Sequence, residues 1–278
     1  MWDILARGQR FQEIRSSMPP RSTVVEYWDA IVSHFLEGDT SYSPEPLKRW
    51  LQSYSGRGAG AVVLEALPEP YIGDLAAGRF RAVILALNPG EARLDFQGRA
   101  GVFADEIRAL GSYHFWAATL PYFGEKWRRR YGKNRFHESR LRFLRTWFGE
   151  NFRETEMLTF ELYPWHSKIK RGDIRPDPVI IREFIWKPIA DLGNPTVFAF
   201  GADWMRLVVD MGVQVEAKLG GNGTDYGSTV SSRCVLVGRT TEGGPVVVEK
   251  HSGSAGPPRR EEAKRLQEYL RSKLGIGL

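Results

Sequence analysis

Residues 82–90 read Ala-Val-Ile-Leu-Ala-Leu-Asn-Pro-Gly, an apolar run that stops at an amide side chain, a proline and a glycine. The run has the length of a buried strand, and open α/β sheets bind their ligands at the carboxyl ends of such strands. Pro89 fixes its own backbone and favours an extended Asn88, while Gly90 lets a ligand approach the main chain closely. We therefore predict that Asn88 lies at a strand end and belongs to a binding or catalytic site.

Apolar strands alternate with helices along the rest of the chain. Strands are predicted at 157–163, 196–200, 234–237 and 246–248, and helices at 23–37, 102–118, 135–149, 204–211 and 259–274, with one more that starts at Asp177-Pro178 and is ended or kinked by Pro188. This alternation predicts an α/β fold with a largely parallel sheet. We expect two parts, a helical extension over residues 1–60 that packs on the core and an α/β domain over residues 61–278.

The composition limits the class of protein. With 278 residues, 42% of them hydrophobic, and nine tryptophans, the chain is expected to fold around a sizeable core. No apolar run approaches the roughly 20 residues that span a bilayer, and charged residues in the first 13 positions argue against a signal peptide. Cys234 is the single cysteine, which excludes an intrachain disulfide and a four-cysteine metal site. We expect a cytoplasmic monomer with no metal, no organic cofactor and no membrane contact.

Positive charge is concentrated between residues 126 and 145. This segment has nine basic residues and one acid, a net charge of +8 against +6 for the whole chain. Aromatic residues alternate with the charges at 127, 131, 136, 143 and 147. Basic residues neutralise phosphates and aromatic rings stack on bases, so the pattern is typical of a nucleic-acid-binding face, although a solvated amphipathic helix over core aromatics fits it equally well. The predicted DNA contacts in this segment are Lys126, Arg128, Arg129, Arg130, Lys133 and Arg135.

Several motifs follow one another in a recognisable order. They are Pro68-Glu69-Pro70-Tyr71-Ile72-Gly73, Asn88-Pro89-Gly90, the stretch from Thr159 to Ser167, Ala199-Phe200-Gly201-Ala202 and Lys250-His251-Ser252-Gly253. In this order, over residues 65–275, the chain resembles the uracil-DNA glycosylase superfamily, in its Asn-Pro-Gly branch. The last motif departs from the family pattern, because Ser252 and Gly253 replace the usual Pro-Ser. The resemblance implies a three-layer α/β/α fold with a central, mainly parallel four-stranded sheet.

The resemblance also implies the roles of individual residues. Asn88 would position the water that attacks the sugar, and His251 would stabilise the departing base by a hydrogen bond. The substrate would be double-stranded DNA with one modified base flipped out of the helix. Residues expected around the base are Leu87, Pro89, Gly90, Glu91, Phe160, Glu161 and Ser252, and the loop and helix after His251 would add Ser254, Arg259 and Arg260 to the DNA contacts.

Two positions indicate which base is removed. In the uracil-specific branch a tyrosine at the position of Gly90 blocks groups on C5 of the pyrimidine, so the glycine implies room for a bulky 5-substituent. No asparagine follows the second strand; Phe160 would stack on the base, or the Glu161 carboxylate would accept from the N4 amino group of cytosine, unless Glu161 only pairs with an arginine. A modified cytosine is therefore favoured, such as glucosylated hydroxymethylcytosine in phage DNA, and with it a role in anti-phage defence.

Other functions stay open at this point. The chain could be a uracil or mismatch glycosylase of base-excision repair. It could be a non-catalytic module that binds modified DNA, because the His251-Ser252-Gly253 motif is weakened. It could also be an unrelated α/β hydrolase that acts on nucleotides and uses its basic segment to bind phosphates.

Overall fold

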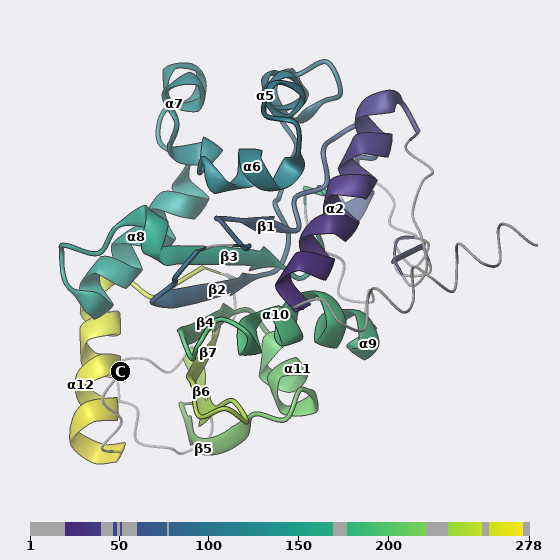
Figure 1. Cartoon of the computed structure of the whole chain (residues 1–278). Helices are drawn as coiled ribbons and strands as arrows, with labels where there is room; N and C mark the ends of the chain where they lie inside the picture. The colour runs from purple at the N-terminus through teal and green to yellow at the C-terminus, as the bar shows by residue number, and fades with distance from the viewer. Residues whose placement is uncertain are drawn as a thin grey trace, which may run out of the picture.

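The central sheet has seven strands, of which the inner four are parallel (Figure 1). The computed structural model describes residues 20–39, 47–48, 51, 60–76, 78–168, 177–220, 233–251 and 256–274. The strands are β1 (Tyr71–Ile72), β2 (Ala82–Ala86), β3 (Met157–Glu161), β4 (Thr196–Phe200), β5 (Gln214–Leu219), β6 (Arg233–Arg239) and β7 (Pro245–His251), in the order β1-β3-β2-β4-β7-β6-β5. The pairs β3–β2, β2–β4 and β4–β7 are parallel, while β1, β6 and β5 add antiparallel edges.

Helices pack against both faces of this sheet. They are α2 (Pro20–Glu37), α4 (Leu94–Gln97), α5 (Val102–Leu110), α6 (Tyr113–Ala118), α7 (Glu125–Tyr131), α8 (Arg135–Phe148), α9 (Pro178–Ile181), α10 (Lys187–Ala190), α11 (Trp204–Asp210) and α12 (Arg260–Leu274), with single turns η2 (Pro121–Phe123), η3 (Glu154–Glu156) and η4 (Arg182–Trp186). Alternate residues of each inner strand point to opposite faces, as strand geometry requires. Val83 and Leu85 join one apolar cluster with α2, α5, α6 and α9–α11, whereas Ala82 and Ile84 join a second with α8 and α12.

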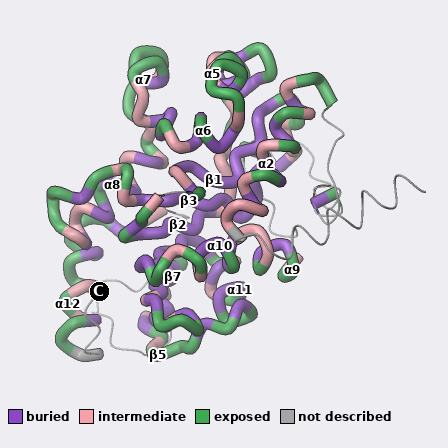
Figure 2. Tube along the Cα trace, viewed as in Figure 1, coloured by how far each residue is buried: buried purple, intermediate pink, exposed green. Residues whose placement is uncertain are grey.

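The core lies along the inner strands. All five residues of β2, β3 and β4 are buried, while the outer turns of α5, α7 and α12 are exposed (Figure 2). Continuous apolar runs of this kind are typical of parallel strands that are covered on both faces. No helix among the described residues is long and apolar enough to cross a membrane.

The α/β class is confirmed, but the prediction of a four-stranded sheet is wrong, because β1, β5 and β6 extend it to seven. The predicted helix at 102–118 is two helices: Gly111 adopts a left-handed backbone (φ +87°) and Ser112 caps α6 by accepting from the Phe115 amide. Pro188 does not end its helix. The π turn η4 precedes it, and the helix continues through Pro188 to Ala190 as α10.

Candidate functional site

The Asn-Pro-Gly loop begins where β2 ends, beside the end of β3. Ala86 pairs with Glu161 in the sheet, and the ladder continues as Tyr163 N donates to Leu87 O at 2.8 Å. On the other side, the buried Trp204 indole donates to Ala86 O at 3.0 Å. These bonds fix the end of β2 between two neighbours, so the residues that follow it leave the sheet from a rigid base.

Asn88 and Gly90 are both held by the loop that follows β3. The Asn88 amide nitrogen donates to Ser167 O at 3.0 Å and to Ser167 Oγ at 3.2 Å. Since the NH2 group is engaged there, Oδ1 is the atom of Asn88 that is left to accept a hydrogen bond from a ligand or a water. Gly90 O accepts from His166 Nδ1 at 3.1 Å.

The other side of Gly90 is open. Its backbone is left-handed (φ +83°), and a Cβ placed there would meet no atom of the described residues within 4 Å. The position therefore has space that the side chain of a larger residue would fill.

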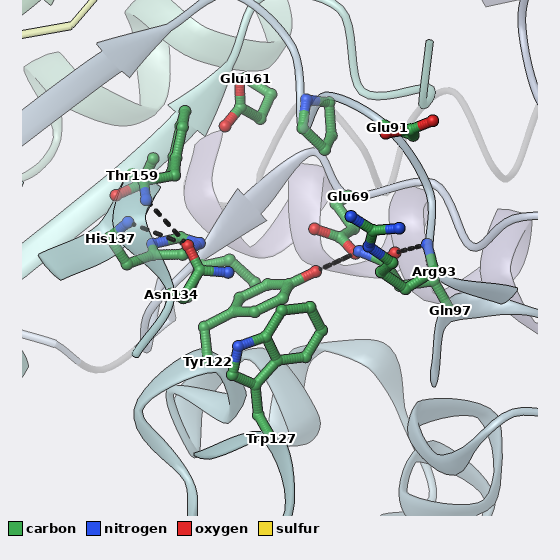
Figure 3. Close-up of a pocket in the computed structure, with 13 residues that line it drawn as sticks. Glu69, Glu91, Arg93, Gln97, Tyr122, Trp127, Asn134, His137, Thr159 and Glu161 are labelled. Carbon is green, nitrogen blue, oxygen red and sulfur yellow. Dashed lines mark hydrogen bonds between the residues drawn. The ribbon is translucent and has the colours of Figure 1, made fainter. Parts of the chain in front are cut away.

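A cavity of about 130 Å³ lies next to this loop (Figure 3). An apolar cavity of roughly 150 Å³ holds a benzene molecule, so this one has room for a single ring. Figure 3 places Thr159, His137 and Asn134 on one side, Glu69, Gln97 and Arg93 on the other, and Tyr122 and Trp127 beneath. The lining residues are Glu69, Ile72, Pro89, Glu91, Arg93, Gln97, Tyr122, Trp127, Asn134, Phe136, His137, Thr159 and Glu161.

Strand β3 contributes two polar side chains to the cavity. Thr159 and Glu161 are buried, and neither Thr159 Oγ1 nor Glu161 Oε2 has a hydrogen-bond partner in the described part of the chain. Such orphaned oxygens are costly unless a ligand or a water satisfies them. Phe160 points to the opposite face, is 1% exposed and packs edge-on against Tyr71, so the prediction that it stacks on a base is wrong. Strands alternate their side chains, and of these two residues only Glu161 lines this cavity.

Burial sets the charge states in the cavity. It raises the pKa of Glu161 well above its ordinary value, and the positive charge of Arg140 opposes this rise. Burial, together with Arg140, lowers the pKa of His137 to about 3, so His137 is neutral near pH 7. The neutral imidazole stacks on Tyr122 with ring centroids 4.6 Å apart. A neutral, planar and polar ligand therefore matches the cavity better than an anion.

The first turn of α8 forms one wall. Asn134 is the N-cap and its Oδ1 accepts from the Phe136 and His137 amides at 3.0 and 3.2 Å. Asparagine is among the preferred N-cap residues, and it places Phe136 and His137 at the start of the helix, facing the cavity.

The opposite wall is built around one buried carboxylate. Glu69 is 3% exposed, and its Oε1 accepts from Gln97 Nε2 at 2.8 Å and from the Tyr122 hydroxyl. His166 Nε2 lies 3.2 Å from the same oxygen, outside hydrogen-bond geometry. Gln97 Oε1 in turn accepts from Arg93 N at 2.6 Å.

Other predicted substrate residues lie elsewhere. Leu87 packs on Gly201, where a Cβ would come within 2.9 Å of Leu87 Cδ1, and it does not line the cavity. His251 is half-buried at the end of β7, beside Arg233, and is also absent from the lining. It shares the carboxyl edge of the sheet with Asn88. The strands that carry the two residues, β7 and β2, are two positions apart, so their backbones are separated by about 10 Å. Ser252 and Ser254 lie outside the described residues.

The six predicted DNA contacts of the basic segment are exposed, but most are ion-paired. Lys126 pairs with Glu106, Arg128 with Glu138, Arg129 with Glu125 and Arg130 with Asp95. Lys133 and Arg135 form no ion pair within the described part of the chain. They flank the cavity residue Asn134.

The aromatic residues of this segment are mostly core residues. Trp127, Phe143 and Trp147 are buried, which contradicts the expectation that they stack on bases at a surface. Arg140 is buried as well, with its guanidinium 3.3 Å from the centre of the Phe136 ring. The surface charge of the segment is therefore lower than its sequence indicates.

Arg259 and Arg260 are exposed at the start of α12, far from the cavity. Arg260 pairs at 3.0 Å with Glu150, which follows the last turn of α8. The cavity lies at the first turn of α8, and a helix of 14 residues is about 21 Å long. The prediction that both arginines help to hold DNA at the site gains no support from this placement.

The wall opposite β3 and the role of His166 were not predicted from the sequence. Glu69, Gln97, Tyr122 and His166 come from four separate loops or turns and share no local pattern. Glu69 and His166 lie in two of the motifs that the family resemblance singles out, and Asn134, three residues before His137, was a further signal because it is a typical N-cap. Among the described residues, no group of three His, Cys, Asp or Glu side chains could hold a metal ion. Comparisons of the chain with protein-family models, with curated proteins and with solved structures gave no match.

Proposed function

We propose that this protein is a DNA glycosylase that hydrolyses the N-glycosidic bond of a modified cytosine in double-stranded DNA and leaves an abasic site. The observation on which the proposal depends is the one-ring cavity beside Asn88-Pro89-Gly90, with the oxygens of Thr159 and Glu161 unsatisfied inside it. A flipped pyrimidine has the size, the planarity and the polar edge that these groups require. A uracil or mismatch glycosylase would use the same cavity.

The reaction needs little covalent chemistry from the protein. Cleavage passes through an oxocarbenium-like sugar, so a water must be held on one side and the departing base stabilised on the other. Asn88 Oδ1 would accept from that water, since the amide nitrogen is engaged by Ser167. An amide is a weak base, so the step depends on orienting the water. His251, on the same edge of the sheet, would donate to the base oxygen as its negative charge develops.

Glu161 is the proposed recognition residue. Its Oε2 would accept from the N4 amino group of cytosine, and it would donate from its protonated form to N3. The raised pKa of Glu161 favours that protonated form. The open side of Gly90 would receive a bulky group on C5, such as the sugar of glucosylated hydroxymethylcytosine. Removal of such bases from phage DNA would serve anti-phage defence.

The DNA backbone would lie over the loop between α7 and α8. Lys133 and Arg135 are exposed there on either side of Asn134, at the N-terminus of α8. Helix N-termini favour anions, so a phosphate at this place would offset the unfavourable position of Arg135 in the first turn.

The test is base release from matched duplexes that contain uracil, hydroxymethylcytosine or its glucosylated form, with mass spectrometry of the free base and alkaline cleavage of the abasic site. We expect release of the 5-substituted cytosine, and a loss of at least 100-fold in Asn88→Ala. Glu216→Gln on β5 is the matched control, because its exposed ion pair with Arg239 is remote from the cavity. Tight binding of these DNAs without base release, unchanged in Asn88→Ala, would instead indicate a non-catalytic binding module. Hydrolysis of free nucleotides without DNA binding would indicate the nucleotide hydrolase.

A further inference from the structure

The Asn-Pro-Gly loop and the wall of the cavity meet at a single carboxylate. On one side, Glu69 Oε1 accepts from Tyr122 and Gln97, both of which line the cavity. On the other, it lies 3.2 Å from His166 Nε2, and His166 Nδ1 holds the Gly90 carbonyl. His166 is fully buried and Glu69 nearly so, which makes these contacts insensitive to solvent screening.

Main-chain hydrogen bonds also connect the segment before β1 to the loop that follows β3. Glu69 N donates to Pro164 O at 2.7 Å, and Val63 N donates to His166 O at 2.9 Å. The loop after β3 is therefore bonded at two points, Pro164 and His166, to the segment before β1. The same loop supplies Ser167, which holds the amide nitrogen of Asn88.

We propose that Glu69 is a positioning residue that couples the occupied cavity to the conformation of the Asn-Pro-Gly loop. A base that contacts Tyr122 or Gln97 tightens the hydrogen bonds to Glu69, and Glu69 fixes His166 and, through it, the carbonyl of Gly90. Asn88 is then held with Oδ1 towards its water only while the loop is fixed. This inference rests on the proposed function for the role of the water, but the coupling itself is a property of the fold.

The main test compares Glu69→Gln with the wild-type chain. The variant keeps the volume of the side chain and removes its charge. We expect kcat for base release to fall about 10- to 100-fold with KM unchanged within a factor of two, because misplacement of a positioned group affects the chemical step. Hydrogen exchange gives a readout that needs no activity: the amides of Val63 and Tyr163, bonded to His166 O and Leu87 O, should exchange about tenfold faster, while β4 amides stay unchanged.

Tyr122→Phe is the second variant, and it tests the coupling through Glu69 even if Glu69→Gln does not fold. It removes only the hydroxyl that donates to Glu69, and it should still speed exchange at Val63 and Tyr163 a few-fold. Glu216→Gln serves again as the control and should change neither rate. Unchanged exchange in both cavity variants would overturn the inference, as would a rise in KM at constant kcat. If the wild-type chain releases no base from any DNA, the proposed function fails, and the exchange measurement still decides the coupling.

Discussion

Glu161 and Glu249 are two buried glutamates near the carboxyl ends of parallel strands, β3 and β7, and both point to the α8–α12 face of the sheet. Burial raises the pKa of each. Their surroundings differ. Glu161 borders a cavity, whereas Glu249 is enclosed and lies 3.8 Å from Arg233, which also contacts Glu262 on α12 at 3.4 Å.

The difference separates a recognition group from a structural one. Each carboxyl has an arginine near it, Arg140 for Glu161 and Arg233 for Glu249, and Arg233 links β6, β7 and α12 through its contacts with Glu249 and Glu262. Glu161 Oε2 and both carboxyl oxygens of Glu249 lack a hydrogen-bond partner in the described chain, but only Glu161 borders the cavity in which a ligand can supply one. Residue type, strand position and burial are shared, so only the presence of a cavity distinguishes the two roles.

The largest expected effect concerns activity. Glu161→Met should lower base release from glucosylated hydroxymethylcytosine about 100-fold, because methionine can neither accept from the amino group nor donate to N3. Glu249→Gln should leave the rate within a factor of two. Single-turnover rates on one duplex measure both. Equal losses of rate in the two variants would show that Glu161 has no special role in recognising the base.

A second effect concerns stability and is tested at Glu249, which lies outside the cavity. Its pKa is about 8 in the folded chain and 4.5 when exposed, so the folded state keeps a proton that the unfolded state has lost. The free energy of unfolding should therefore decrease as pH rises from about 4.5 to 8, by about 5 kcal/mol relative to Glu249→Gln. Urea unfolding at pH 5, 7 and 9 measures this, and parallel curves for the wild type and the variant would show that Glu249 does not titrate in this way.

The smallest expected effect is a change in DNA affinity on removal of one of two exposed arginines, Arg135 or Arg260. Arg135→Ala, next to the cavity, should weaken DNA binding about threefold and reduce the slope of log Kd against log salt by about one. Arg260→Ala, at the α12 end, should change neither, since Arg260 already pairs with Glu150. Fluorescence titrations at three salt concentrations measure both slopes. A larger loss in Arg260→Ala would move the DNA path to α12.

The fold was predictable where burial is complete. β2, β3 and β4 are buried along their whole length, so their apolar runs are continuous in the sequence. β5 was missed because Gln214–Leu219 is mostly exposed and polar, and β1 because it has two residues. Edge strands obtain their stability from the neighbouring strand, which a single sequence does not show.

The site was predictable where one strand end defines it. Pro89, Glu91 and Glu161 line the cavity, and Gly90 borders open space, as expected from their positions after β2 and at the end of β3. Leu87 and Phe160 were assigned to the site because they are neighbours in sequence, but strand alternation turns Phe160 into the core. The contacts of Glu69 form between loops that are distant in sequence, and no local pattern encodes them.

The open space beside Gly90 has a practical consequence. Under the proposed function, a pyrimidine nucleotide that bears a long linker at C5 would still enter the cavity, with the linker leaving past Gly90 into solvent. Biotin or a fluorophore could be attached there without touching the groups that recognise the base. A non-hydrolysable duplex of this kind would serve as an affinity probe for this chain and for other glycosylases with a glycine at this position, and it would exclude those with a blocking tyrosine.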